Sequence, residues 1–409
     1  MTYQRFIIYF TLLLTIGFYC LDYFFRISPS LILPQLMAQY HTDPMGIGLF
    51  ASVFYIGYVI FQLPCGVLLD RHEIKYPVII LITLCTLSFL GFIIADQFWL
   101  GILLRFILGA TSACSFIAVL YIARMYLDDK WFSMVSGITI AAGTLAASII
   151  QTLNAWLIQW LSWQTVIGLF SIWGFIVAGL LLMMPSQLST HRPLLYQRHS
   201  YWTLIKQLLQ LLLRWRFLMN GVIGGLFYLP TSLLTAVWGI SFFKSSYHLS
   251  TPQASSVIFL IFLGWAIGAP MIGFFGGRLH HTRLLTALPA ILAAGISALM
   301  LLDSTWLQHG LFIAALLFGL CSSAQVMVWK QFNTLCPPNL SGVGIAATNM
   351  VIMGIVAITH TAIGYLVEVG YQHNHALNTV AYLSGLGWIP WIFVSVAILA
   401  LMNGIRPKA

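Results

Sequence analysis

The chain has 409 residues, of which 60% are hydrophobic and 7% are charged, and its mean hydropathy is +0.94. Soluble globular domains have an apolar fraction of about one half, so this composition excludes a soluble protein. The formal net charge of +9 at pH 7 reflects 18 Lys and Arg against 9 Asp and Glu, and we interpret it as membrane topology, not nucleic-acid binding.

Apolar stretches recur along the whole chain. A helix needs about 20 predominantly apolar residues to cross a bilayer. Counting stretches of that length between polar breaks predicts an all-α membrane protein with twelve transmembrane helices. They cover residues 7–34, 46–69, 76–95, 98–123, 132–159, 163–184, 217–243, 252–277, 284–302, 306–329, 341–369 and 379–402.

The basic residues predict the orientation of these helices. If both termini are cytoplasmic, nearly all Lys and Arg outside the helices fall in cytoplasmic segments, and only Lys244 lies on the other side. Cytoplasmic loops of membrane proteins carry such an excess of positive charge. We therefore expect a multi-pass protein of the bacterial inner membrane, with cytoplasmic N and C termini.

Three ionisable side chains are predicted to lie inside the bilayer. Asp22 and Arg26 are four residues apart on the first helix and hence on one face, and Arg105 lies at a similar depth on the fourth. Two guanidinium groups against one carboxylate leave a surplus positive charge, which a carboxylate substrate held by arginine geometry would neutralise. Asp22 would pair with Arg26 in the empty site and take a proton when the substrate binds Arg26, which is a basis for proton symport.

A simpler interpretation of the same charges is structural. Asp22 and Arg26 would only neutralise each other, and Arg105 would brace helix packing through backbone carbonyls. This alternative stays open at the level of the sequence.

The loop GVLLDRHEIK, from Gly66 to Lys75, lies between the second and third predicted helices. Gly66 would let two helices approach, and Asp70 would accept the N-terminus or an arginine of a neighbouring helix. Arg71 would hold the loop on one side of the membrane. Arg124, at the end of the fourth helix, is a candidate partner for Asp70, with an ordinary topology charge as the alternative.

Further polar side chains within the predicted helices are candidates to complete a substrate cavity. Each is alternatively an interhelical hydrogen bond or a core aromatic residue. The candidates are Tyr58, Gln62, Tyr228, Trp238, Gln325, Trp329, Asn349 and His360, and we include Tyr58, Gln62, Tyr228 and Gln325 in the predicted substrate site.

Proline residues and missing motifs add two expectations. Pro29, Pro64, Pro230 and Pro270 are predicted to kink their helices. The sequence has no Walker, HExxH or GxSxG motif, and its six cysteines form no CxxC pair, so we expect no enzymatic activity, no cofactor, no metal site and no disulfide.

An internal repeat divides the chain. At an offset of 207 residues, Gly, Arg, Asp and Trp residues coincide: Gly57 with Gly264, Gly66 with Gly273, Arg71 with Arg278, Asp96 with Asp303 and Trp99 with Trp306. We infer a six-helix half at 1–184 and another at 217–409. The segment 185–216 joins them as a basic cytoplasmic linker that includes a possible amphipathic helix. Two such halves around a midplane site are typical of alternating-access transporters.

The loop GVLLDRHEIK resembles the signature of the major facilitator superfamily between its second and third helices. The stretches FFRISPSLILPQLM, FYIGYVIFQLPCGVLLD and LLRFILGATSACSFIAVLYIARMY are similar to those of bacterial nutrient symporters related to the anion:cation symporters and to phagosomal nutrient transporters. The resemblance implies two pseudo-symmetric six-helix halves.

The same resemblance implies roles for single residues. Arg26 and Arg105 would bind the substrate anion, and Asp70 and Arg71 would hold the inner side closed. It also implies that only the first half keeps the loop carboxylate, and the second copy indeed has Gly277 at that position. One departure is that the anion:cation symporters place Asp directly before the arginine of the first helix, where this chain has Phe25.

Together these features predict a monomeric secondary transporter that moves a small carboxylate-bearing nutrient, such as an organic acid or an amino acid, by proton symport. Its partners would be the anionic substrate, protons and the lipid bilayer. One alternative is an exporter or importer of a polycarboxylate siderophore or a drug. Another is a membrane sensor or scaffold that does not transport.

Overall fold

The computed structural model consists of helices and describes residues 2–30, 32–126, 129–184, 201–278, 282–302, 310–336, 341–374 and 377–403. In this part of the chain, eleven helices are long and apolar enough to cross a membrane, and one further apolar helix, Lys75–Gly91, is shorter. These account for the twelve predicted helices. The predicted fold class, an all-α membrane protein, is confirmed.

The first six spans take up the chain as far as Met183. Their elements are α1 (Thr2–Ile27), η1 (Ser28–Ser30), α2 (Leu33–Tyr40), α3 (Pro44–Arg71), α4 (Lys75–Gly91), α5 (Phe98–Tyr126), α6 (Asp129–Leu157) and α7 (Trp163–Met183).

The remaining spans follow a short helix, α8 (Tyr201–Leu212), whose Leu208 and Leu211 are buried while Trp202 and Leu209 are exposed. Several of these spans are divided into two or three helical pieces. The elements are α9 (Trp215–Ser232), the π-helical η3 (Leu233–Trp238), α10 (Gly239–Tyr247), α11 (Thr251–Arg278), α12 (Thr282–Leu301), α13 (Leu311–Ser322), η5 (Ser323–Gln325), α14 (Val326–Leu335), α15 (Ser341–Asn374), α16 (Thr379–Leu386) and α17 (Ile389–Asn403).

The prolines affect their helices differently. Helix α1 ends at Ile27, and Pro29 lies in the 3₁₀ turn η1 that separates α1 from α2. Pro230 lies near the end of α9, just before the π-helical η3. In contrast, α3 and α11 continue through Pro64 and Pro270. A proline lacks the backbone N–H of a helical hydrogen bond, so each freed carbonyl needs another donor.

The internal repeat corresponds to one helix contact that occurs twice. Gly57 of α3 and Gly109 of α5 are so close to the facing helix that a Cβ atom would lie 2.4 and 1.9 Å from a backbone carbonyl oxygen. Gly264 of α11 and Gly319 of α13 show the same crossing, with 2.1 and 2.0 Å. Small residues let membrane helices approach to backbone contact. The coincidence of Gly57 with Gly264 in the sequence therefore reflects equivalent packing in the two halves.

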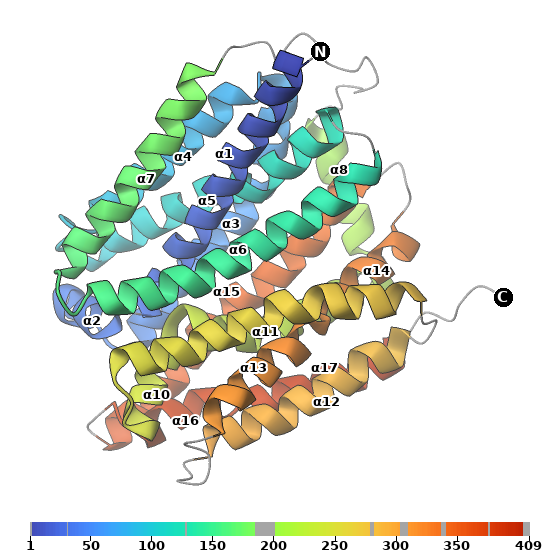
Figure 1. The fold of residues 1–409 in the computed structure, drawn as a ribbon. Coiled ribbons are helices and arrows are strands. Elements are labelled where there is room, and N and C mark those ends of the chain that lie inside the picture. Colours follow the sequence, from blue (N-terminus) through green and yellow to red (C-terminus); the bar gives the residue numbers. More distant parts are fainter. Residues whose placement is uncertain are drawn as a thin grey trace.

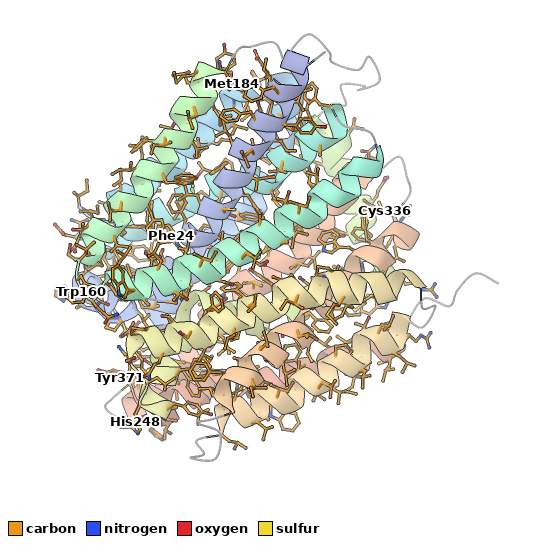
Figure 2. All side chains as sticks on the ribbon, viewed as in Figure 1. Phe24, Trp160, Met184, His248, Cys336 and Tyr371 are labelled. Atoms are coloured by element: carbon orange, nitrogen blue, oxygen red, sulfur yellow. The ribbon has the colours of Figure 1, made fainter. Side chains whose placement is uncertain are left out.

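The two sets of helices come together at one end. In Figure 1 the ribbons converge near α2 and α10 and diverge toward the N and C termini. In Figure 2, Trp160, His248 and Tyr371 lie toward the first end, and Met184 and Cys336 lie toward the other. We call the first the α2 end; the charge distribution predicts that it faces outward. Contacts between the two sets run along α3 with α15, α6 with α11, and η1 with η3.

Candidate functional site

The helix break at Pro29 organises the centre of the molecule. In a regular helix the carbonyl of Phe25 would accept a hydrogen bond from the residue four positions later, which is Pro29 and has no N–H. Arg105 of α5 supplies a donor in its place: its Nη1 lies 2.6 Å from the Phe25 carbonyl oxygen and its Nη2 lies 3.0 Å from that of Arg26. The Ser28 hydroxyl also donates to the Phe25 carbonyl, over 3.2 Å. Arg105 is 1% exposed. It therefore caps the broken end of α1.

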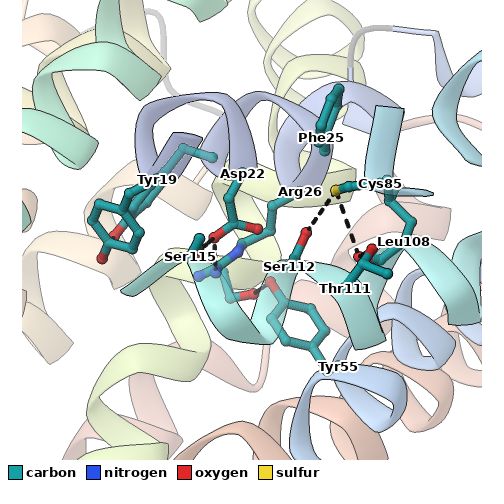
Figure 3. Close-up of polar contacts among 12 residues, drawn as sticks. Tyr19, Asp22, Phe25, Arg26, Tyr55, Cys85, Leu108, Thr111, Ser112 and Ser115 are labelled. Carbon is teal, nitrogen blue, oxygen red and sulfur yellow. Dashed lines mark hydrogen bonds and ion pairs between the residues drawn. The ribbon is translucent and has the colours of Figure 1, made fainter. Parts of the chain in front are cut away.

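Arg26 lies beside this cap and forms an ion pair with Asp22, one turn earlier in α1. The Nη2–Oδ2 distance is 2.8 Å, and both side chains are buried. Ser115 of α5 also faces the carboxylate, with its Oγ 3.4 Å from Asp22 Oδ2. Figure 3 shows the pair and Ser115 together. The predicted convergence of Asp22, Arg26 and Arg105 is thus what the structure shows.

Aromatic rings surround the guanidinium of Arg26. Its Cζ lies 5.0 Å from the ring centroid of Tyr23, 5.3 Å from that of Tyr58 and 5.7 Å from that of Phe54. These distances are within the range of cation–π attraction. The rings let Arg26 keep its charge away from water, and Tyr23 and Tyr58 add phenolic hydroxyls.

Some polar atoms of this cluster have no hydrogen-bond partner within the described residues. They are Asp22 Oδ1, Arg26 Nε and Arg105 Nε. A buried polar group without a partner costs free energy. Asp22 and Arg26 thus each have unused capacity for a further hydrogen bond.

Arg26 also reaches the second half of the chain. Its Nη1 lies 3.4 Å from the hydroxyl of Tyr228 on α9, which is a long hydrogen bond. Tyr58 and Tyr228, both predicted as substrate ligands, therefore contact Arg26 from α3 and α9. A molecule bound at Arg26 would touch both halves of the chain.

The other predicted site residues are placed differently. Gln325 donates from Nε2 to the carbonyl oxygen of Gly224, 3.1 Å away, and so ties η5 to α9. Gln62 is buried, and its Oε1 has no partner among the described residues. At Gly66 a Cβ atom would meet nothing within 4 Å, so this glycine does not serve close helix approach in the present conformation. The side chains of Asp70, Arg71 and Arg124 lie outside the described part.

A second polar cluster was not predicted as a unit. Ser232 Oγ of α9 lies 2.8 Å from the Tyr55 hydroxyl of α3 and 2.9 Å from His360 Nε2 of α15. The rings of Tyr55 and His360 are stacked, with centroids 5.4 Å apart. The sequence singles out His360 as a polar residue in an apolar helix. Tyr55 and Ser232 carry no comparable signal.

Comparisons with known proteins identify the family and the fold. Residues 12–360 match the Major Facilitator Superfamily. The uncharacterized transporter YybO of Bacillus subtilis is 24% identical over 92% of both chains. The probable galactarate/D-glucarate transporter GudP of Escherichia coli is 24% identical over 86% of this chain and 85% of its own. A crystal structure of a mutant of the nucleoside transporter NupG covers 98% of this chain and 100% of its own, with a TM-score of 0.78 at 14% identity.

The family match spans most of the chain, and the helices form the corresponding fold. Relatives of nearly equal length are named as transporters, not as enzymes. This chain is therefore a member of the major facilitator superfamily, a multi-pass membrane transporter.

Proposed function

We propose that this transporter is a proton-coupled symporter that brings a small carboxylate-bearing nutrient across the bacterial inner membrane by alternating access. The observation that carries the proposal is the buried Asp22–Arg26 ion pair, which lies at the break of α1 and reaches the second half through Tyr228. The units that move are the segments 1–184 and 217–409, joined by 185–216.

The charges of the site support an anionic substrate. Asp22 neutralises one guanidinium, and Arg105 adds a second positive charge next to the first through its bond to the Arg26 carbonyl. Charges buried in a membrane are kept where they pair or line a pathway. An incoming carboxylate supplies the missing negative charge. Arg26 is its direct ligand, because its two terminal nitrogens contact only side chains, those of Asp22 and Tyr228, whereas both terminal nitrogens of Arg105 hold backbone carbonyls.

The hydroxyl groups around Arg26 support a hydroxylated acid. Tyr23, Tyr58 and Tyr228 place phenolic groups beside the guanidinium, and these can donate to or accept from a substrate hydroxyl. GudP, similar to this chain over most of its length, is named for galactarate and D-glucarate, which are sugar acids with carboxylates and hydroxyls. Among small carboxylates we therefore place sugar acids and other hydroxy acids ahead of amino acids.

Coupling to protons follows from competition for Arg26. A substrate carboxylate that binds Arg26 displaces Asp22, and a free carboxylate in a buried apolar site is costly unless it takes a proton. Substrate and proton would then bind together and be released together, which is linkage between two ligands. Asp70 and Arg71, at the end of α3, would hold the inner side closed during this cycle.

Ligand-dependent stability of the purified protein tests the proposal. A panel of sugar acids, dicarboxylates, amino acids, siderophores and neutral sugars would be screened by thermal unfolding. A true ligand at a hundredfold excess over its dissociation constant stabilises the folded state by about 2.7 kcal/mol. We expect a shift with a hydroxylated acid that is lost in Arg26→Gln. Stabilisation by neutral sugars alone would contradict the proposal.

A further inference from the structure

The hydroxyl of Ser232 joins three helices at the α2 end of the site. It lies between Tyr55 of α3 and His360 of α15, at 2.8 and 2.9 Å, while Ser232 itself belongs to α9. All three side chains are buried, and His360 is 0% exposed. We call Tyr55, Ser232 and His360 the clasp. Since α3 lies in the first half of the chain and α9 and α15 in the second, the clasp connects the two.

Only the uncharged form of His360 fits the clasp. A neutral imidazole has one donor and one acceptor nitrogen, and a serine hydroxyl can serve either. His360 Nε2 faces Ser232, while Nδ1 is buried without a partner among the described residues. A second proton would create an unpartnered buried N–H and place a positive charge within the electrostatic reach of Arg105.

The helices around the clasp are packed tightly enough to exclude water. A Cβ atom on Gly48 would lie 2.9 Å from the Cα of Gly364, so α3 and α15 touch at the backbone. Between this contact and the clasp, Ser52 Oγ and Thr361 Oγ1 lie 2.7 Å apart. Separation of α3 from α15 at this end is therefore what would expose His360 to water.

We propose that the clasp is a pH-responsive lock on the α2 end: it holds α3 against α9 and α15 while His360 is neutral and releases them when His360 takes a proton. The inference depends on the alternating-access part of the proposed function and not on the substrate. In the released state His360 meets water, where an imidazole takes up a proton near pH 6.5. Because the released state binds more protons than the locked state, its population rises as the pH falls.

The groups near His360 in the described part of the chain supply no negative charge that would compensate the positive charge of a protonated imidazole. Among the described residues, no carboxylate forms a hydrogen bond or an ion pair with the imidazole, and the ion pair of Asp22 with Arg26 is neutral as a unit. Glu368 lies two turns further along α15, where its Oε1 accepts from Gln372. The groups on the surrounding helices are Tyr55 on α3, Arg105 on α5, Tyr228 one turn before Ser232 on α9, the α1 pair Asp22–Arg26, and Glu368 on α15 itself. Tyr382 on α16 packs instead against Trp238 and Phe242.

Hydrogen–deuterium exchange of the full-length protein in lipid nanodiscs tests the lock without any substrate. Peptides covering 44–56 and 358–370 would be followed at pH 5 and pH 8, with rates corrected for intrinsic chemical exchange. We expect faster corrected exchange at pH 5, and loss of this difference in His360→Gln. His248→Gln is the matched control, because His248 is an exposed histidine at the same end, and it should keep the difference.

Tyr55→Phe provides a second variant that keeps the ring stacked on His360. It removes the hydroxyl bonded to Ser232, so exchange at pH 8 should rise toward the pH 5 value. Unchanged exchange at pH 8 in Tyr55→Phe would overturn the proposal, as would a wild-type pH difference in His360→Gln. These exchange rates measure helix opening and not substrate binding. They would therefore test the clasp even if the substrate proved not to be a carboxylate.

Discussion

Arg105 donates to the carbonyl oxygen of Phe25 over 2.6 Å and so fills the place of the backbone N–H that Pro29 lacks. This bond lets α1 end in the middle of an apolar environment with its last carbonyls satisfied. Because Arg105 also holds the carbonyl of Arg26, it fixes the backbone from which the Arg26 side chain projects. Arg105 is thus a positioning residue in this conformation.

Arg105→Lys should lower the stability of the ligand-free protein. Lysine keeps the positive charge but has no planar fork, so it cannot serve both carbonyls with the same geometry. Each lost hydrogen bond costs about 0.5–1.5 kcal/mol, and the Ser28 hydroxyl, 3.2 Å from the Phe25 carbonyl oxygen, remains as a donor there. Thermal unfolding without ligand measures the loss. An unchanged midpoint would show that Arg105 is not needed as a cap, and would favour its predicted role as a direct substrate ligand.

Arg26→Lys and Tyr228→Phe should affect binding more than folding. Arg26→Lys keeps the pair with Asp22 but loses the bidentate geometry, so affinity for the carboxylate should fall by about 1–3 kcal/mol. Tyr228→Phe removes one hydroxyl at the end of a long contact of 3.4 Å and should cost about 0.5–1.5 kcal/mol of affinity. Titration calorimetry with the ligand from the stability screen measures both. Wild-type affinity in Arg26→Lys would place the substrate elsewhere.

The glycines at the two equivalent helix crossings offer a test of the helix packing. Gly109→Ala and Gly319→Ala should each destabilise the protein by about 1–3 kcal/mol, because the new methyl group would collide with a facing backbone carbonyl. Gly66→Ala and Gly273→Ala are matched controls at repeat-related positions where a Cβ atom meets nothing within 4 Å. In the controls we expect the stability to be unchanged or slightly higher, because alanine has a higher helix propensity than glycine. Equal losses at all four positions would contradict the described packing.

Features that differ clearly from an apolar background could be predicted from the sequence. Twelve apolar stretches predict the helices, and the rarity of charges makes Asp22, Arg26 and Arg105 conspicuous. Their common depth follows from the rise per residue of a helix, which is why their convergence could be predicted. The repeat likewise aligned Gly57 with Gly264, whose close contacts with a facing helix the structure then showed.

Other parts of the site depend on side-chain direction across long distances in the chain. Ser232 contacts Tyr55 across 177 positions and His360 across 128, and a hydroxyl in an apolar helix has no characteristic spacing. The sequence did contain a signal for the role of Arg105, because Pro29 follows Phe25 by four residues. That signal predicts an orphaned carbonyl, and the structural interpretation of Arg105 as a brace through backbone carbonyls agrees with the two hydrogen bonds that it makes.

The last prediction concerns proton coupling. In Asp22→Asn the side chain keeps its size and can still accept a hydrogen bond from Arg26, but it cannot release or take a proton. The variant should therefore bind the substrate and exchange it across the membrane, while a pH gradient should no longer drive accumulation, because the linkage between proton and substrate is lost. Counterflow and gradient-driven uptake in the same proteoliposomes measure the two activities.

Asp96→Asn, at an exposed carboxylate near the α2 end, is the control and should retain both activities. If Asp22→Asn still concentrates the substrate in response to a pH step, Asp22 is not the proton carrier, and the buried carboxyl of Glu368 becomes the next residue to test.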